Sequence, residues 1–163
     1  MNRCASRIAA AVLLITSISA HAEWPDRPIK IVVPFPAGNS SDVVMRLLGE
    51  RLGSRLGQPV VIENRVGAGG VIGTSAAAKA APDGYTLVMG STGPLSIAQW
   101  LRPSSMPYSA TTDFVAIGAI AYAPQVLTVR NDLTVANFKE FLSYGTKDGK
   151  SLNYGSNGNG TTP

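Results

Sequence analysis

The sequence is almost without cysteine and histidine. Its 163 residues hold one of each, Cys4 and His21, and both lie within the first 22 residues. The stretch 23–163 therefore offers no thiol and no imidazole. A cysteine nucleophile, a Ser–His pair, a Cys/His zinc site and a disulfide are all excluded there. We expect no cofactor and no metal, although a site built from carboxylates alone stays possible.

Charge is also scarce and dispersed. The formal net charge is +4, but removing Arg3 and Arg7 leaves 12 Lys and Arg against 10 Asp and Glu, a net charge of +2. Nucleic-acid binding through phosphate neutralisation needs a basic stripe, and the basic residues are scattered singly. We therefore expect no nucleic-acid partner. The content of hydrophobic residues, 45%, is that of a globular chain.

Residues 1–22 have the pattern of a secretory signal peptide. Arg3 and Arg7 give a positive start, Ile8–Ala20 is an apolar run, and Ala20-His21-Ala22 is a small-x-small cleavage site. The alternative, a membrane anchor, needs about 20 apolar residues, more than this run supplies. We expect cleavage after Ala22 and a periplasmic protein.

Strand-like and helix-like segments alternate after residue 23, which predicts an α/β fold with a mostly parallel sheet flanked by helices. The expected strands are Ile29–Val33, Val60–Ile62, Tyr85–Met89 and a short Leu152–Tyr154. The first helix is expected to start at an N-cap of Ser40 or Ser41, to end at Gly57, and to bury Val44, Leu47, Leu48, Leu52 and Leu56. Further helices are expected over Ile72–Ala81, after Gly93-Pro94, and after a Thr134 cap, where Val135, Phe138 and Leu142 share one face.

Three loops of one kind carry the functional signal: Pro34–Asp42, Gly90–Gly93 and Gly155–Thr162. Each follows an expected strand, is rich in small or hydroxyl residues, and leads toward a helix start. Free backbone N–H groups and the positive end of the helix dipole make such a loop an anion site. The simpler interpretation is helix capping alone. Right-handed crossovers would place all these loops at one edge of the sheet.

Other candidate motifs are set aside. A dinucleotide fingerprint starting at Gly67 would need glycine where Ile72 stands, so we expect this segment to form a tight turn with close helix-to-sheet packing. The last loop lacks the lysine of a phosphate loop. Asp42 is interpreted as a first-turn acid that favours the helix dipole, and Glu63 as a surface residue. Phe35 could line a pocket or the core.

Several segments together resemble one family, the tripartite tricarboxylate transporter substrate-binding receptors, or Bug proteins. They cover nearly all of residues 24–162 in order: Trp24–Ile29, Val33–Gly38, Leu56–Arg65, Gly67–Gly70, Ala80–Leu87, Asp113-Phe114 and Leu152–Ser156. The resemblance implies a two-lobed, type II periplasmic-binding-protein fold whose hinge closes both lobes on a small carboxylate. It also implies a ligand held by backbone amides and waters.

Carried onto this sequence, the resemblance gives a set of expected ligand-binding residues: Phe35, Pro36, Ala37, Gly38, Asn39, Ser40, Ser41, Ser91, Thr92, Ser156, Asn157, Gly158, Gly160 and Thr161. Asn39 departs from the family pattern, in which a second glycine usually follows Gly38. Asn39 could change the backbone angle there or add an amide side chain to the pocket.

The expected function is capture of a small organic carboxylate without chemistry, and its delivery by a monomeric receptor to a membrane permease. Family chains are about twice as long, and the last glycine-rich loop lacks a following helix. We therefore expect a truncated chain: a signal peptide at 1–22, a partial first lobe at 23–125, and the hinge crossing with the start of a second lobe at 126–163. The alternatives are a secreted α/β enzyme with catalytic residues in the missing half, and a fragment without function.

Overall fold

Three parallel strands form the centre of the structure, a computed structural model that describes residues 23–122, 124, 126–146, 153, 155 and 161. The strands are β1 (Ile29–Val33), β2 (Val60–Asn64) and β3 (Thr86–Val88), in the order β2-β1-β3. These three expected strands and their parallel pairing are confirmed. β2 is two residues longer than expected, since its last residue, Asn64, still pairs with Val33. The signal-peptide and Leu152–Tyr154 predictions fall outside the described residues, apart from Asn153.

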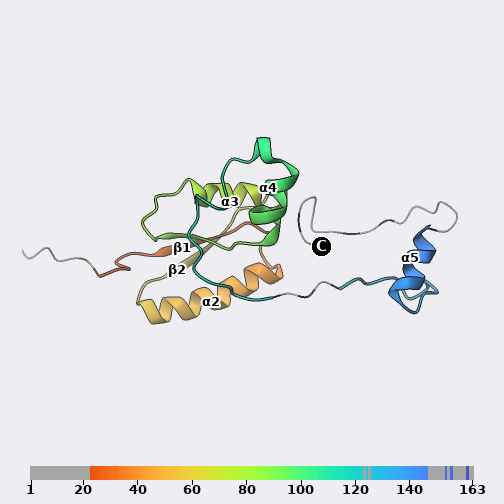
Figure 1. The fold of residues 1–163 in the computed structure, drawn as a ribbon. Helices are drawn as coiled ribbons and strands as arrows, with labels where there is room; N and C mark the ends of the chain where they lie inside the picture. The colour runs from red at the N-terminus through yellow and green to blue at the C-terminus, as the bar shows by residue number, and fades with distance from the viewer. Residues whose placement is uncertain are drawn as a thin grey trace, which may run out of the picture.

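Helices cover both faces of this sheet (Figure 1). They are α2 (Ser40–Leu56), the 3-10 turn η1 (Ala68–Gly70), α3 (Val71–Ala78), the π-helical turn η2 (Gly93–Ile97), α4 (Ala98–Leu101), the 3-10 turn η3 (Pro103–Ser105) and α5 (Phe138–Thr146). α2 packs on β1 and β2, whereas α3 packs on β1 and β3 from the other face. Within the described part of the chain, no helix has the length and apolarity needed to cross a bilayer.

The core lies between the sheet and α2, where Ile31, Val33 and Met45 are buried. The expected apolar face of α2 is wrong in part: Leu48 packs against the core, but Val44 and Leu47 are exposed. The buried positions are instead Asp42, Met45 and Gly49. A Cβ at Gly49 would lie only 3.3 Å from side-chain carbons of β2, so this glycine lets the helix approach the strand closely.

Both ends of α2 are capped, but the N-cap differs from the expectation. Asn39, not Ser40 or Ser41, is the N-cap, because its backbone is extended (φ −75°, ψ 170°) while Ser40 is already helical. Its side-chain oxygen accepts the N–H of Asp42 at 2.9 Å. The C-terminal expectation is confirmed, since Gly57 has φ +68° and donates its N–H to Gly53.

The glycine-rich segment 67–73 forms a tight turn against β1, as expected. A Cβ at Gly73, in α3, would lie 2.5 Å from the carbonyl oxygen of Arg65 and 2.9 Å from the Cα of Pro34. α3 is shorter than the expected Ile72–Ala81, because it ends at Ala78. The turn before β3 is also as expected, with Gly84 at φ +83°.

The chain after residue 110 adds no strand to the sheet among its described residues. α5 lies apart from the sheet in Figure 1 and buries none of its residues. Its expected Thr134 cap is wrong: Asn137 accepts the N–H of Glu140 at 3.0 Å, and the Glu140 carboxylate accepts the N–H of Ala136 at 2.8 Å. This reciprocal arrangement starts the helix at Phe138.

The close approach at Gly73 predicts a destabilising Gly73→Ala substitution. Alanine would normally stabilise a helix interior by about 1 kcal/mol relative to glycine. Here its methyl group would collide with backbone atoms, which cannot move aside as a side chain can. We expect the free energy of unfolding, measured by urea denaturation, to fall by about 1–3 kcal/mol.

The matched control is Gly118→Ala, because a Cβ at Gly118 meets no atom within 4 Å. We expect that variant to unfold at the same urea concentration as the wild type. A Gly73→Ala protein as stable as the wild type would contradict the proposed close packing.

Candidate functional site

The loops after the three strands meet at the carboxyl edge of the sheet. Gly70 marks the meeting point, because a Cβ there would lie 3.2 Å from Pro94, 3.5 Å from Pro34 and 3.6 Å from the ring of Phe35. In open α/β sheets ligands bind outside this edge of the strands. The first two expected loops, 34–42 and 90–93, therefore lie where such a ligand would bind.

The loop after β1 leaves backbone donors free at the start of α2. The first four N–H groups of a helix have no acceptor inside the helix. The side-chain oxygen of Asn39 accepts one of them, that of Asp42. The N–H of Asn39 itself donates to the carbonyl of Pro36 at 3.3 Å, and the N–H of Val43 makes the first bond of the helix with the carbonyl of Asn39 at 3.0 Å. Among the described residues, no acceptor is bonded to the N–H groups of Ser40 and Ser41.

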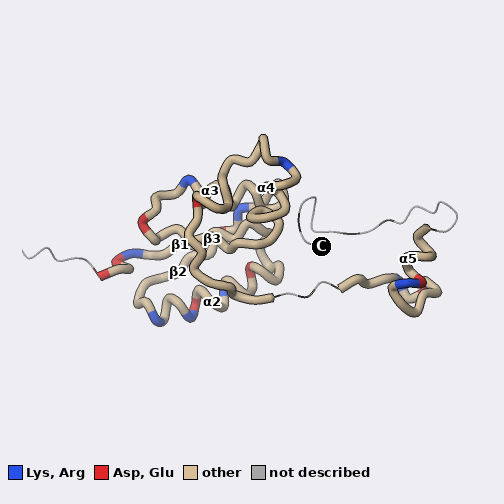
Figure 2. Tube along the Cα trace, in the orientation of Figure 1, with Lys and Arg blue, Asp and Glu red and all other residues tan. Residues whose placement is uncertain are grey.

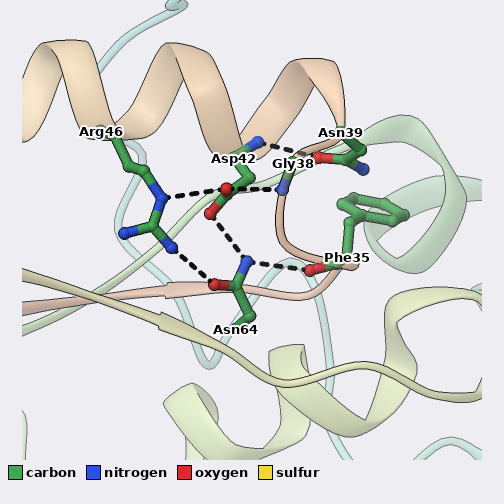
Figure 3. Close-up of polar contacts among 6 residues, drawn as sticks. All are labelled: Phe35, Gly38, Asn39, Asp42, Arg46 and Asn64. Atoms are coloured by element: carbon green, nitrogen blue, oxygen red, sulfur yellow. Dashed lines mark hydrogen bonds and ion pairs between the residues drawn. The ribbon is translucent and has the colours of Figure 1, made fainter.

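Behind this loop lies a polar network around the carboxylate of Asp42 (Figure 3). Asp42 is only 2% exposed. One of its oxygens accepts the N–H of Gly38 at 2.8 Å and the Nε–H of Arg46 at 3.0 Å. The other accepts from Nδ2 of Asn64, the last residue of β2, at 2.8 Å. The network thus joins the loop, α2 and β2.

Asn64 also reaches the loop directly. Its Nδ2 donates to the carbonyl of Phe35 at 3.1 Å, and its Oδ1 accepts from Nη2 of Arg46 at 3.0 Å. The hydrogen bond from Arg46, followed by those from Gly38 and Asn64, lowers the pKa of Asp42 to about 2. Asp42 is therefore charged at neutral pH, and every oxygen of its carboxylate has a donor.

The loop after β3 holds a buried hydroxyl without a partner. The Oγ of Ser91 is buried and has no hydrogen-bond partner among the described residues. Thr92, beside it, is exposed at the start of the π-helical turn η2. π-helical turns often occur at functional sites. The hydroxyl of Tyr108 donates to the carbonyl of Pro94 at 2.7 Å, which fixes this turn to the following segment.

The structure brings together part of the expected ligand-binding set. Pro36, Ala37, Gly38 and Ser40 are exposed in the first loop, and Asn39 and Ser41 are partly buried beside them. Phe35 packs against the core, so its ring serves the core as well as the loop. Ser156, Asn157, Gly158 and Gly160 fall outside the described residues, and Thr161 is partly buried.

Sequence reasoning missed Asn64 and Arg46 and underestimated Asp42. Asp42 is more than a first-turn acid, because it binds the loop and β2 together. Glu63 is not simply a surface residue either. Its carboxylate lies between Lys30, at 3.3 Å, and Arg65. The signal available in the sequence was the Asp42–Arg46 spacing of four residues, which places both side chains on one helix face.

The donors of the two loops are uncharged. No residue of 35–41 or 90–93 carries a charge, and Figure 2 shows Lys and Arg interspersed with Asp and Glu along the described chain. Among the described residues, no group of three or more His, Cys, Asp or Glu could hold a metal ion. What the edge offers a ligand is therefore backbone amides, hydroxyls and the Asn39 side chain.

A family model described as TctC, tripartite tricarboxylate transporter family receptor, matches residues 44–163. The chain belongs to this receptor family. The resemblance inferred from the sequence motifs is thereby confirmed. Similar solved structures include a periplasmic binding protein, so the expected binding-protein fold is confirmed for the part of the domain that the sheet and its helices represent.

Two Bordetella pertussis proteins illustrate the similarity. Protein BugT is 49% identical over 121 residues, which are 74% of this chain and 37% of BugT. A UPF0065 protein is 38% identical over 157 residues, 96% of this chain and 48% of that protein. The chain thus spans less than half the length of these curated relatives.

Solved structures of similar proteins match as well. R. palustris Rpa4515 with adipate aligns with a TM-score of 0.76 at 34% identity, over 85% of this chain and 46% of that one. MatC from Rhodopseudomonas palustris with bound malate aligns with a TM-score of 0.69 at 36% identity, over 76% and 42%. The periplasmic binding protein BugD aligns with a TM-score of 0.60 at 38% identity, over 77% of this chain and 41% of BugD.

The low pKa of Asp42 predicts a loss of stability in acid. The pKa is about 2 in the fold, against 3.8 for the unperturbed group. Between these values the unfolded chain binds more protons than the folded chain, so the free energy of unfolding falls as the pH falls. The contribution of Asp42 to the free energy of unfolding is fully present above about pH 5. It is lost progressively as the pH falls to about 2. We expect the melting temperature to follow this profile.

Asp42→Asn should flatten that part of the profile, because the titrating group is gone. Glu50→Gln is the matched control: it removes an exposed carboxylate from the same helix and should leave the profile unchanged. An Asp42→Asn protein with the acid profile of the wild type would contradict this assignment.

Proposed function

We propose that the protein is a periplasmic receptor that captures a small organic carboxylate and delivers it to a membrane permease. The observation that carries this proposal is the pair of free N–H groups, of Ser40 and Ser41, at the carboxyl edge of the sheet. Two of the similar proteins were solved with a dicarboxylate, Rpa4515 with adipate and MatC with malate. The helix N-terminus favours an anion there through its amides and its dipole.

In this proposal one carboxylate group of the ligand accepts from the amides of Ser40 and Ser41. The buried hydroxyl of Ser91 supplies a donor from the neighbouring loop, and the lack of a hydrogen-bond partner for it among the described residues supports that role. Thr92 and the exposed backbone of 35–38 border the same place. Amide donors carry no net charge, so they bind an anion without a compensating cation, which suits an uncharged loop.

The rest of the ligand contacts come from the second lobe. We assign residues 23–125 to the first lobe and 126–163 to the crossing and the start of the second. Ser156, Asn157, Gly158, Gly160 and Thr161 then contact the ligand from the other side when the lobes close. The receptor binds without a chemical step, and residues 1–22 are removed on export, so that the mature protein is a periplasmic monomer beginning at Glu23.

The first test is a ligand panel on the complete protein that contains this chain. We expect succinate, malate, adipate or citrate to raise the melting temperature, by an amount that grows with the logarithm of ligand concentration over Kd. At 100 times Kd the stabilisation is about 2.7 kcal/mol. The corresponding fully amidated compounds, which lack the negative charge, are the control and should give no shift.

No shift with any acid of the panel would contradict the proposed function. Recovery of the bound acid unchanged, by mass spectrometry, should accompany binding. Conversion of the acid during incubation would instead indicate an enzyme.

The second test removes one amide donor without disturbing the helix. Ser40 is the first helical residue, where proline is well tolerated, and Asn39 before it has the extended backbone that a following proline needs. Ser40→Pro therefore deletes the N–H while preserving α2. We expect the Kd for the bound acid, measured by calorimetry, to rise about tenfold or more.

Ser40→Ala is the matched control, because it removes the hydroxyl but keeps the N–H. Its affinity should stay within about twofold of the wild type, well under the 1.4 kcal/mol of a tenfold change. If Ser40→Ala weakened binding as much as Ser40→Pro, the side chain and not the backbone would be the donor.

A further inference from the structure

The loop between β1 and α2 is fixed at two backbone atoms by side chains from outside it. The carbonyl of Phe35 accepts from Asn64, and the N–H of Gly38 is donated to Asp42, at 3.1 and 2.8 Å. Between these atoms the loop has no regular structure, and Gly38 has φ +84°. Figure 3 shows both side chains reaching the loop from the side of α2 and β2.

Asn64 is itself held firmly. It is the last residue of β2 and pairs in register with Val33, the last residue of β1. Its side chain uses its oxygen for Arg46 and its nitrogen for Phe35 and Asp42. The side chain of Asn64 therefore ties the geometry of the loop to the paired strands β1 and β2.

Asp42 is unsuited to contact an anionic ligand. It is 2% exposed, and a carboxylate repels another carboxylate. It also consumes the N–H of Gly38, which is then unavailable to a ligand. Arg46 lies against the Asp42 carboxylate at 3.0 Å and offsets its charge. Asp42 can instead fix the backbone geometry of the site. It holds Gly38 in the conformation that leads into Asn39 and the free amides of Ser40 and Ser41.

We propose that Asp42 and Asn64 are positioning residues for ligand capture, which clamp the loop 35–39 so that the amides of Ser40 and Ser41 are already in place when the carboxylate arrives. This inference rests on the proposed function. A site held in its bound geometry loses less conformational freedom on binding, and that difference appears as affinity. Neither residue touches the ligand.

The test compares the loss of hydrogen bonds at two places in the sheet. Asn64→Ala, in the complete protein, removes three of them: those to Phe35, to Asp42 and from Arg46. Tyr85→Phe is the matched control at the opposite edge of the sheet, where the Tyr85 hydroxyl donates to the Asp26 carboxylate at 2.6 Å and accepts the N–H of Asp26 at 2.9 Å. The probe is the acid with the largest thermal shift in the panel.

We expect Asn64→Ala to raise the Kd of that acid about fivefold to thirtyfold, and Tyr85→Phe to change it by less than about twofold. Asp42→Asn, which keeps the side-chain size and so preserves folding, is the second variant. It should also raise the Kd, because Gly38 and Asn64 donate to different oxygens of the Asp42 carboxylate, and an asparagine side chain keeps only one acceptor oxygen.

An NMR signature separates positioning from loss of stability. The backbone amide signals of Gly38, Ser40 and Ser41 in the ligand-free protein should move in Asn64→Ala and Asp42→Asn, and should stay in place in Tyr85→Phe. Clear binding by the wild type with equal affinities in all variants would overturn this inference alone. So would equal weakening by Tyr85→Phe. A wild type that binds no acid would overturn the proposed function and this inference with it.

Discussion

A buried carboxylate decides the geometry of the carboxyl edge of the sheet. Asp42 is removed from water, and a buried charge is tolerated only when donors replace the lost hydration. Its donors come from three segments that are distant in the chain or differ in structure: the loop at Gly38, the helix at Arg46 and the strand at Asn64. Because all three must converge on two oxygen atoms, the positions of loop, helix and strand are fixed relative to one another.

The backbone donors beside this carboxylate are divided into two groups. Those of Gly38, Asp42 and Val43 are satisfied within the protein, and those of Ser40 and Ser41 are left over. This division explains how a negative side chain can lie next to a site for a negative ligand. Asp42 is buried with Arg46 against it, whereas the free amides belong to Ser40, which is exposed, and to Ser41, which is partly buried. In the proposed function the amides hold the anion, and Arg46 offsets the charge of the neighbouring carboxylate.

Much of the fold follows from local sequence, but the contacts of Asp42 and Asn64 with the loop 35–39 do not. The β-branched run of β1 and the glycine after α2 specify their elements almost alone, and both predictions are confirmed. The N-cap was mistaken because Asn39, Ser40 and Ser41 are all good caps, and only the backbone conformation selects among them. Val44 and Leu47 fit the apolar period of α2, but the buried face of the helix carries Asp42, Met45 and Gly49, and both side chains are exposed. The partnership of Asp42 with Asn64 spans 22 residues, so no short pattern could show it.

Asn39 is the position at which the resemblance leads one to expect a second glycine, and the structure shows how a side chain is accommodated there. Its φ of −75° lies in a region open to every L-residue, so a side chain there causes no strain. The side-chain oxygen caps the helix through Asp42, which leaves the amide nitrogen as a further donor beside the N–H groups of Ser40 and Ser41. The same residue therefore strengthens the helix start and enlarges the set of uncharged donors at the edge of the sheet. A site built from main-chain amides can change its ligand preference in this way through a neighbouring side chain, while the backbone that supplies the amides keeps its course.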